Sequence, residues 1–196
     1  KDRDFVKEMA KHKKTFYGMT MNGGISNNDV YEFIEGARVA DDKLEALENI
    51  QEFGVQNFGI SSIIMRDVND DFVISDFFKL YRKYPVITYF KFRTTSPLGK
   101  HIKSKPYTTN EYLKLMEKFI PREDIYNHPC NPMKRKGDEC FNCCYNFRYE
   151  KNLTIGMVEF NSEPSRKCWR RGQTIPNTFE LVTFFQYMND NYREEE

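Results

Sequence analysis

The chemistry-bearing residues of this 196-residue chain are five cysteines, all of which lie between positions 130 and 168. Cys140 and Cys143 have a C-x2-C spacing, which lets two thiolates reach one metal ion from a tight turn. Cys168 follows a segment that reads as a β-hairpin, and a hairpin can return it to the same place. Cys130 or Cys144 would supply a fourth ligand. The pattern therefore predicts a metal centre.

The residues alone leave the identity of the metal open. Thiolate ligands of this kind suit a structural zinc ion and an iron–sulfur cluster equally well. The alternative is a set of unbound thiols, since a free cysteine also occurs in proteins as a small buried hydrophobic residue. An odd number of clustered cysteines does not fit a secreted disulfide framework, which favours a reducing, cytoplasmic location.

The composition excludes several classes of function. The chain has 30 Lys and Arg against 29 Asp and Glu, so no strong non-specific attraction to nucleic acid or anionic lipid is expected. No apolar run approaches the roughly 20 residues that a membrane span needs, and we expect no membrane association. The 17 Phe and 12 Tyr can still form a packed core despite the polar composition.

The first 120 residues alternate between strand and helix patterns, which predicts an α/β fold with a parallel sheet. In the 41–54 helix, Asp41 or Asp42 is the expected N-cap and Gly54 the expected stop. Such a three-stranded sheet has an open edge, which further N-terminal strands, another chain or the C-terminal part would cover. The predicted strands span 15–21, 55–65 and 86–92, and the predicted helices span 41–54, 70–84 and 108–120.

The composition changes after residue 120. The segment that follows is rich in loop residues and holds all the cysteines, with a predicted hairpin at 146–160 and a predicted amphipathic helix at 177–192. We therefore divide the chain into βα units at 1–120 and a cysteine-rich extension at 121–196.

The order of these motifs resembles the later half of the partial (β/α)6 TIM-like barrel of radical S-adenosylmethionine (radical SAM) enzymes. "TMNG" (20–23) is similar to the family's "SLDG" turn, and "GISSIIMRDVND" (59–70) to its "inTVi.r.vNd" strand and loop. "KLEALENIQEFG" (43–54) and "YFKFRTTSPLGK" (89–100) also match in order. In "NNDVYEFIEG" (27–36), Glu35 stands where the family has Arg.

The tail carries a second resemblance. "CFNCCYNFR…LTIGMV…C" is similar to the C-terminal cluster region of the radical enzyme of molybdenum-cofactor biosynthesis, although it has an extra cysteine and a longer gap to Cys168. This resemblance implies an auxiliary [4Fe–4S] cluster, with zinc as the alternative, held by ligands drawn from Cys130, Cys140, Cys143, Cys144 and Cys168.

Membership of the family would imply reductive cleavage of S-adenosylmethionine to a 5′-deoxyadenosyl radical, which abstracts hydrogen from a substrate. The substrate would be a small molecule or a peptide, and the electron donor a flavodoxin or ferredoxin. Because side chains alternate along a strand, only one of Ser61 and Ser62 faces the barrel interior. The same alternation places Lys91 and Arg93 on one common face. The expected cofactor-binding residues are Thr20, Asn22, Ser61, Ser62, Arg66 and Asn69, and the expected substrate-binding residues are Lys91, Arg93, Arg170 and Arg171.

The family's C-x3-C-x2-C loop, which holds the catalytic cluster, is absent because no cysteine precedes Cys130. We expect the N-terminal half of the barrel, with that loop, to lie upstream or on another chain; the alternative is that the protein has lost the radical chemistry. A second hypothesis is a non-catalytic, zinc-stabilised α/β module that binds a protein or a nucleic acid through its basic loops.

Overall fold

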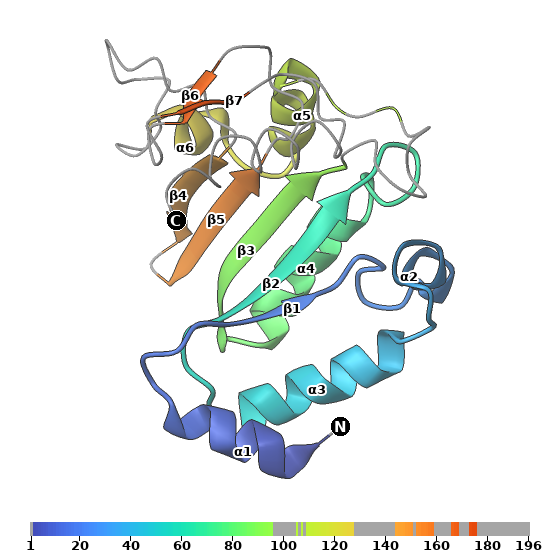
Figure 1. Cartoon of the computed structure of the whole chain (residues 1–196), viewed down its shortest axis with the longest axis vertical. Helices are drawn as coiled ribbons and strands as arrows, with labels where there is room; N and C mark the ends of the chain where they lie inside the picture. Colours follow the sequence, from blue (N-terminus) through green and yellow to red (C-terminus); the bar gives the residue numbers. More distant parts are fainter. Residues whose placement is uncertain are drawn as a thin grey trace, which may run out of the picture.

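The computed structural model describes residues 2–95, 105, 107, 109–127, 144–150, 152–158, 166–168 and 173–175. Their elements follow the strand–helix alternation that the sequence predicts (Figure 1). The helices are α1 (Arg3–Lys11), α2 (Asn28–Glu35), α3 (Ala40–Glu52), α4 (Val73–Lys83), α5 (Thr109–Met116) and α6 (Arg122–Asn127). The strands are β1 (Tyr17–Thr20), β2 (Phe58–Ile64), β3 (Ile87–Thr94), β4 (Cys144–Glu150), β5 (Leu153–Val158), β6 (Arg166–Cys168) and β7 (Gln173–Ile175).

The main sheet has five strands in the order β1-β2-β3-β5-β4. Strands β1, β2, β3 and β5 are parallel, and β4 pairs antiparallel with β5 as the other arm of the predicted hairpin. Each parallel strand is therefore added on the same side of the previous one. The hairpin from the cysteine-rich extension pairs with the edge of β3. At this edge, the C-terminal part therefore covers the three-stranded sheet, which was one of the three alternatives.

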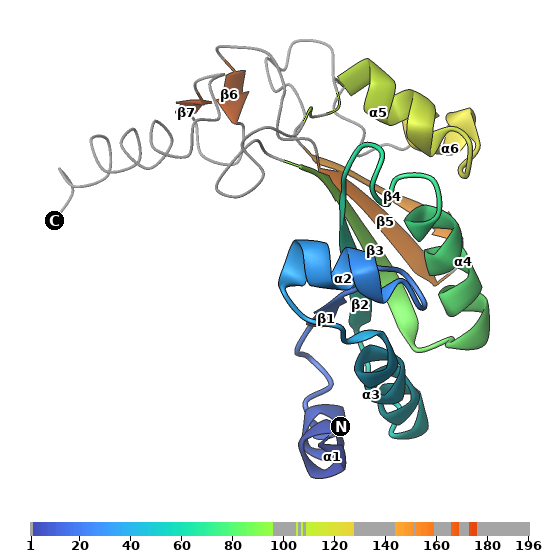
Figure 2. The same cartoon turned by 90° about the vertical axis from the view of Figure 1, so that its right-hand side faces the viewer.

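Of the helices that connect the parallel strands, α2 lies at the edge of the sheet beyond the end of β1, and the others lie on one face (Figure 1). Figure 2 shows α3, α4, α5 and α6 on the same side of the strands. The opposite face, which is turned toward the viewer in Figure 1, carries no helix of the described chain, and we call it the open face. The fold is thus α/β with a mixed, mostly parallel sheet that is wound on one side.

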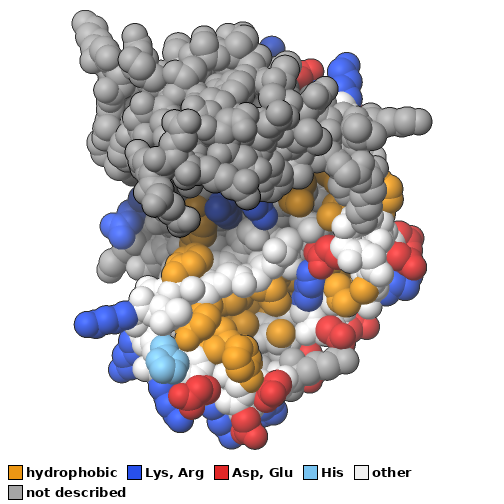
Figure 3. Space-filling model, in the orientation of Figure 1, with side chains coloured by type: hydrophobic (Ala, Val, Ile, Leu, Met, Phe, Trp, Pro, Cys, Tyr) orange, Lys and Arg blue, Asp and Glu red, His pale blue; other side chains and the backbone are white. Residues whose placement is uncertain are grey.

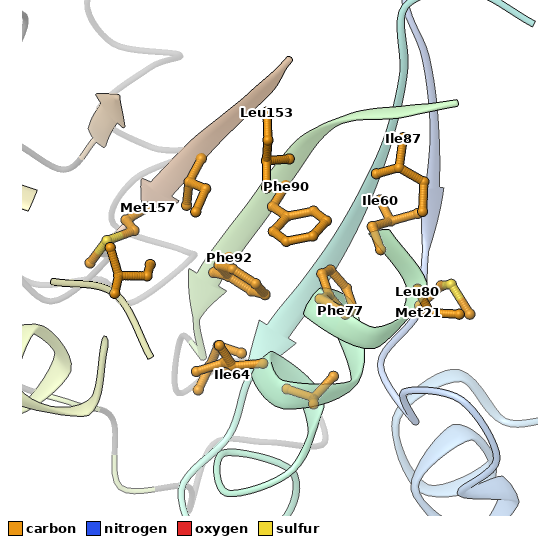
Figure 4. Close-up of a cluster of buried hydrophobic side chains, with 14 of the residues drawn as sticks. Met21, Ile60, Ile64, Phe77, Leu80, Ile87, Phe90, Phe92, Leu153 and Met157 are labelled. Atoms are coloured by element: carbon orange, nitrogen blue, oxygen red, sulfur yellow. The ribbon is translucent and has the colours of Figure 1, made fainter. Parts of the chain in front are cut away.

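The hydrophobic core lies between the sheet and α4. Phe77 of α4 is fully buried, and its ring centroid lies 5.4 Å from that of Phe90 and 5.0 Å from that of Phe92 (Figure 4). Ile155 and Met157 of β5 are also fully buried and extend the same core across the β3 edge. Aromatic pairs of this kind add about 0.5–1.5 kcal/mol each beyond their buried area.

The ends of α3 agree with the sequence at one end only. Gly54 follows the helix with φ +64°, a left-handed conformation that a residue without Cβ adopts readily, so the predicted stop is confirmed. The expected N-cap is wrong, because the helix begins earlier: Val39 is the N-cap and makes no side-chain bond. Asp41 and Asp42 instead lie in the first turn, where a carboxylate interacts favourably with the helix dipole.

No helix in the described part of the chain has both the length and the hydropathy required to cross a bilayer.

Candidate functional site

The open face carries polar residues at the carboxyl ends of β1, β2 and β3. Strand pairing places Ser61 beside Thr20 on one side and beside Lys91 on the other. The hydroxyl oxygens Thr20 Oγ1 and Ser61 Oγ lie 3.3 Å apart and share a hydrogen bond. Arg93 lies one pleat further along β3 and pairs with Ile63. Four residues expected in binding therefore share one surface.

Side chains on alternate positions of β3 have opposite environments. Phe90 and Phe92 are fully buried under the helices, whereas Lys91 and Arg93 are half-buried on the open face. Within the described residues, neither cationic side chain has a hydrogen bond or an ion pair, and the Nε of Arg93 is a buried donor without an acceptor. An unsatisfied buried donor of this kind costs about 1–3 kcal/mol. This part of the open face therefore has positive charge and a hydrogen-bond donor without partners among the described residues.

Three other expected residues form a buried brace at the ends of β1 and β2. Asn22 Oδ1 accepts from the backbone N–H of Ile63 at 2.8 Å and from Ser62 Oγ at 3.2 Å. Asn69 Nδ2 donates to the carbonyl oxygens of Asn22 at 2.9 Å and Ile63 at 2.8 Å, and its Oδ1 accepts from the N–H of Met65 at 2.8 Å. Asn22, Ser62 and Asn69 are buried. A cofactor would have to replace some of these bonds, so their cofactor role stays a prediction.

Sequence reasoning assigned no role to Glu35 and Lys43, which complete this brace. Glu35 accepts from Asn22 Nδ2 at 3.0 Å and forms an ion pair with Lys43. Lys43 Nζ also donates to the carbonyl oxygen of Thr20 at 2.6 Å and lies 4.5 Å above the ring of Tyr31. These contacts fix the end of β1. The one sequence feature that could have indicated this role is Glu35 itself, which stands where the motif that residues 27–36 resemble has Arg.

Glycines allow the turn after β1 to pack tightly. A Cβ on Gly23 would lie 2.3 Å from the carbonyl oxygen of Asn27 and 2.4 Å from the ring of Tyr31. Gly24 has φ +59°, and its carbonyl accepts from the Tyr31 hydroxyl at 2.8 Å. This arrangement explains the predicted Asn-Gly turn and holds Asn22 in the brace.

Arg66 lies in the loop after β2 and is engaged by α5 and the residues before it. Its guanidinium stacks at 4.2 Å on the ring of Tyr107 and forms an ion pair with Glu111 at 2.8 Å. The Tyr107 hydroxyl donates to Asp70, and burial together with that carboxylate raises the pKa of the phenol. Arg66 therefore links two βα loops, and its expected role in cofactor binding remains untested.

The predicted metal ligands are mostly outside the described residues. The predicted site residues outside the described part of the chain are Cys130, Cys140 and Cys143, and also Arg170 and Arg171 of the predicted substrate site. The backbone places Cys144 at the start of β4 and Cys168 at the end of β6, in two different sheets. Among the described residues, no group of three or more His, Cys, Asp or Glu side chains is arranged to hold a metal ion.

A scan against protein-family models gave no match for this chain, and a search of curated proteins gave no significant match either.

Proposed function

We propose that this chain forms the later part of a radical SAM enzyme, in which the open face of the sheet lines the reaction chamber. One observation carries the proposal: the four parallel strands are added in one direction, and the connecting helices α3, α4, α5 and α6 lie on one face. A doubly wound sheet would have helices on both faces. A one-sided sheet is the arrangement of a partial barrel, whose ligands bind at the carboxyl ends of the strands.

In this proposal, the hydroxyl groups of Thr20 and Ser61 bind the polar groups of S-adenosylmethionine, and the cations on β3 face the substrate. The iron–sulfur cluster and S-adenosylmethionine would supply the one-electron chemistry, as cofactors do in enzymes of this kind. The chain itself would bind and orient the reactants. The free edge of β1 would pair with the N-terminal half of the barrel, since β2 is the only strand beside β1 among the described residues.

The first test measures metal and cofactor on the whole chain purified without oxygen. We expect a brown protein with bound iron and sulfide, and retention of radiolabelled S-adenosylmethionine in equilibrium dialysis. Ser61→Ala removes a hydroxyl on the open face, so it should weaken that binding by about three- to tenfold, the equivalent of one hydrogen bond. Ser26→Ala is the matched control, because Ser26 is exposed in the loop before α2 and should leave the affinity unchanged.

A colourless protein with one bound zinc ion and no affinity for S-adenosylmethionine would reject the proposal. That result would favour the alternative hypothesis of a zinc-stabilised binding module. An affinity of Ser61→Ala that equals that of wild type and of Ser26→Ala would show that S-adenosylmethionine binds elsewhere than on the open face.

A further inference from the structure

The open face has a charge pattern that the proposed cofactor does not explain. Lys91 and Arg93 lie two residues apart on β3, which separates their Cα atoms by about 7 Å along the strand. Arg148 of β4 is exposed and pairs with Thr154 of β5, which pairs in turn with Tyr89. Directly paired residues share a face of the sheet, so Arg148 adds a third cation to this face, level with Tyr89 and separated from β3 by β5.

Among the described residues of the open face, no carboxylate offsets these charges. The side chains described there are small, aromatic, aliphatic or basic, and none is Asp or Glu. Figure 3, which views this face, shows Lys and Arg side chains near its middle, and further Lys and Arg side chains together with the acidic ones toward its lower and right-hand parts. The described open-face residues are Gly18, Thr20, Gly59, Ser61, Ile63, Tyr89, Lys91, Arg93, Arg148, Thr154 and Gly156.

The strand neighbours of Lys91 are small. Gly156 of β5 is the partner of Lys91 on one side, and Ser61 is its partner on the other, so neither of its direct partners in the sheet has a large side chain. The buried Nε of Arg93 points to a missing acceptor, because such a donor is normally paired. Guanidinium and ammonium groups bind phosphate and carboxylate through charge-assisted hydrogen bonds.

We propose that Lys91 and Arg93 form a binding site for a small dianionic group, a phosphate or a paired carboxylate, on the substrate of this protein. The inference depends on the proposed function only in that it calls the bound molecule a substrate. The site itself stands on the sheet register, the unpaired cations and the absence of carboxylates on the described surface.

The test uses isothermal titration calorimetry of the whole chain with inorganic pyrophosphate and, in a second arm, with malonate. We expect binding that weakens as salt increases, and the tighter of the two probes identifies the chemistry of the group. Lys91→Gln and Arg93→Gln should each weaken binding of that probe at least tenfold, since each removes a charge-assisted contact. Lys91→Arg keeps the charge and should retain binding better than Lys91→Gln.

Matched controls remove the same charges from the helical layer. Lys114 of α5 and Arg82 of α4 are exposed, so Lys114→Gln and Arg82→Gln should leave the affinity within about twofold, because surface charges at a distance are screened by salt. Far-ultraviolet circular dichroism and thermal unfolding of every variant check that the sheet is intact.

Failure of both probes to bind the folded wild-type protein would overturn the inference, as would equal loss of affinity in the site variants and in the controls. The wild-type measurements separate this outcome from failure of the proposed function. If S-adenosylmethionine binds and neither anion does, the anionic substrate is wrong while the radical SAM proposal stands. If an anion binds at Lys91 and Arg93 but the protein holds neither iron nor S-adenosylmethionine, the site is correct and the radical SAM proposal is wrong.

Discussion

Replacing Asn69 by Asp tests the buried brace with a change of almost no volume. Asn69 is fully buried, and its Nδ2 donates to two backbone carbonyl oxygens, those of Asn22 and Ile63. In Asn69→Asp, an oxygen atom takes the place of that donor. The acceptor bond from the N–H of Met65 can remain, so the change isolates the loss of the donor and the arrival of a charge.

We expect Asn69→Asp to lower the free energy of unfolding by about 3–5 kcal/mol at pH 7, because two buried carbonyls lose their donor and an unpaired carboxylate is buried. The introduced carboxyl has a pKa of about 3.9 in the unfolded chain, and burial beside two carbonyl oxygens raises its pKa in the folded protein. The folded state then binds the proton more tightly. The penalty is therefore smallest below about pH 4 and grows as the pH rises toward the folded-state pKa.

Urea denaturation, followed by circular dichroism between pH 4 and pH 8, measures both effects as a change in midpoint at constant slope. Asn27→Asp is the matched control, since Asn27 caps α2 only by accepting from the N–H of Val30 at 3.1 Å, and Asp caps a helix equally well. A brace variant that is as stable as wild type at pH 7, or whose loss of stability does not depend on pH, would refute this description of the loop ends.

Three further outcomes are expected. Gly23→Ala should lower the free energy of unfolding by about 2–3 kcal/mol, because the added Cβ overpacks the turn. Gly36→Ala meets no atom within 4 Å but has φ +84°, so it should lower the free energy of unfolding by about 1–2 kcal/mol. Equal losses measured in urea would contradict the packing argument. Phe77→Ala should lose about 3–5 kcal/mol by leaving a cavity in the core, and a thermal midpoint like that of wild type would argue against the described packing. Tyr107→Phe should lower the free energy of unfolding by about 1–2 kcal/mol at pH 7, because it removes the hydrogen bond to Asp70. Wild type should lose this contribution above about pH 10, since the pKa of Tyr107 is raised in the folded state and the phenol stabilises the fold only while it keeps its proton, and the variant should show a smaller fall in stability there. Identical alkaline unfolding curves for variant and wild type would exclude the bond to Asp70.

Local patterns were sufficient for most of the elements in the described chain. The apolar spacing of Val73, Phe77 and Leu80 predicted α4, and the residues that follow Pro85 predicted β3. The hairpin of β4 and β5 was also expected. Its attachment to β3 was not specified, because parallel pairing joins residues more than fifty positions apart, such as Tyr89 and Thr154, and no local pattern records it.

The candidate site divides in the same way. Alternation along β3 predicted that Lys91 and Arg93 share a face, and alternation along β2 that Ser61 and Ser62 do not. The brace was not visible in the sequence, since the bonds of Asn22 to Ser62 and Ile63 span about forty residues. The metal centre remains a prediction from the spacing of Cys140 and Cys143.

Taken alone, the sequence determined which side chains lie together on each strand and helix, because backbone periodicity is a local property. Only the tertiary structure decided which face of the sheet the helices cover, and hence that Phe90 and Phe92 are buried while Lys91 and Arg93 are not. Burial depends on which distant elements pack together, and the free energy of burying the phenylalanine rings rather than the charged groups selects that packing.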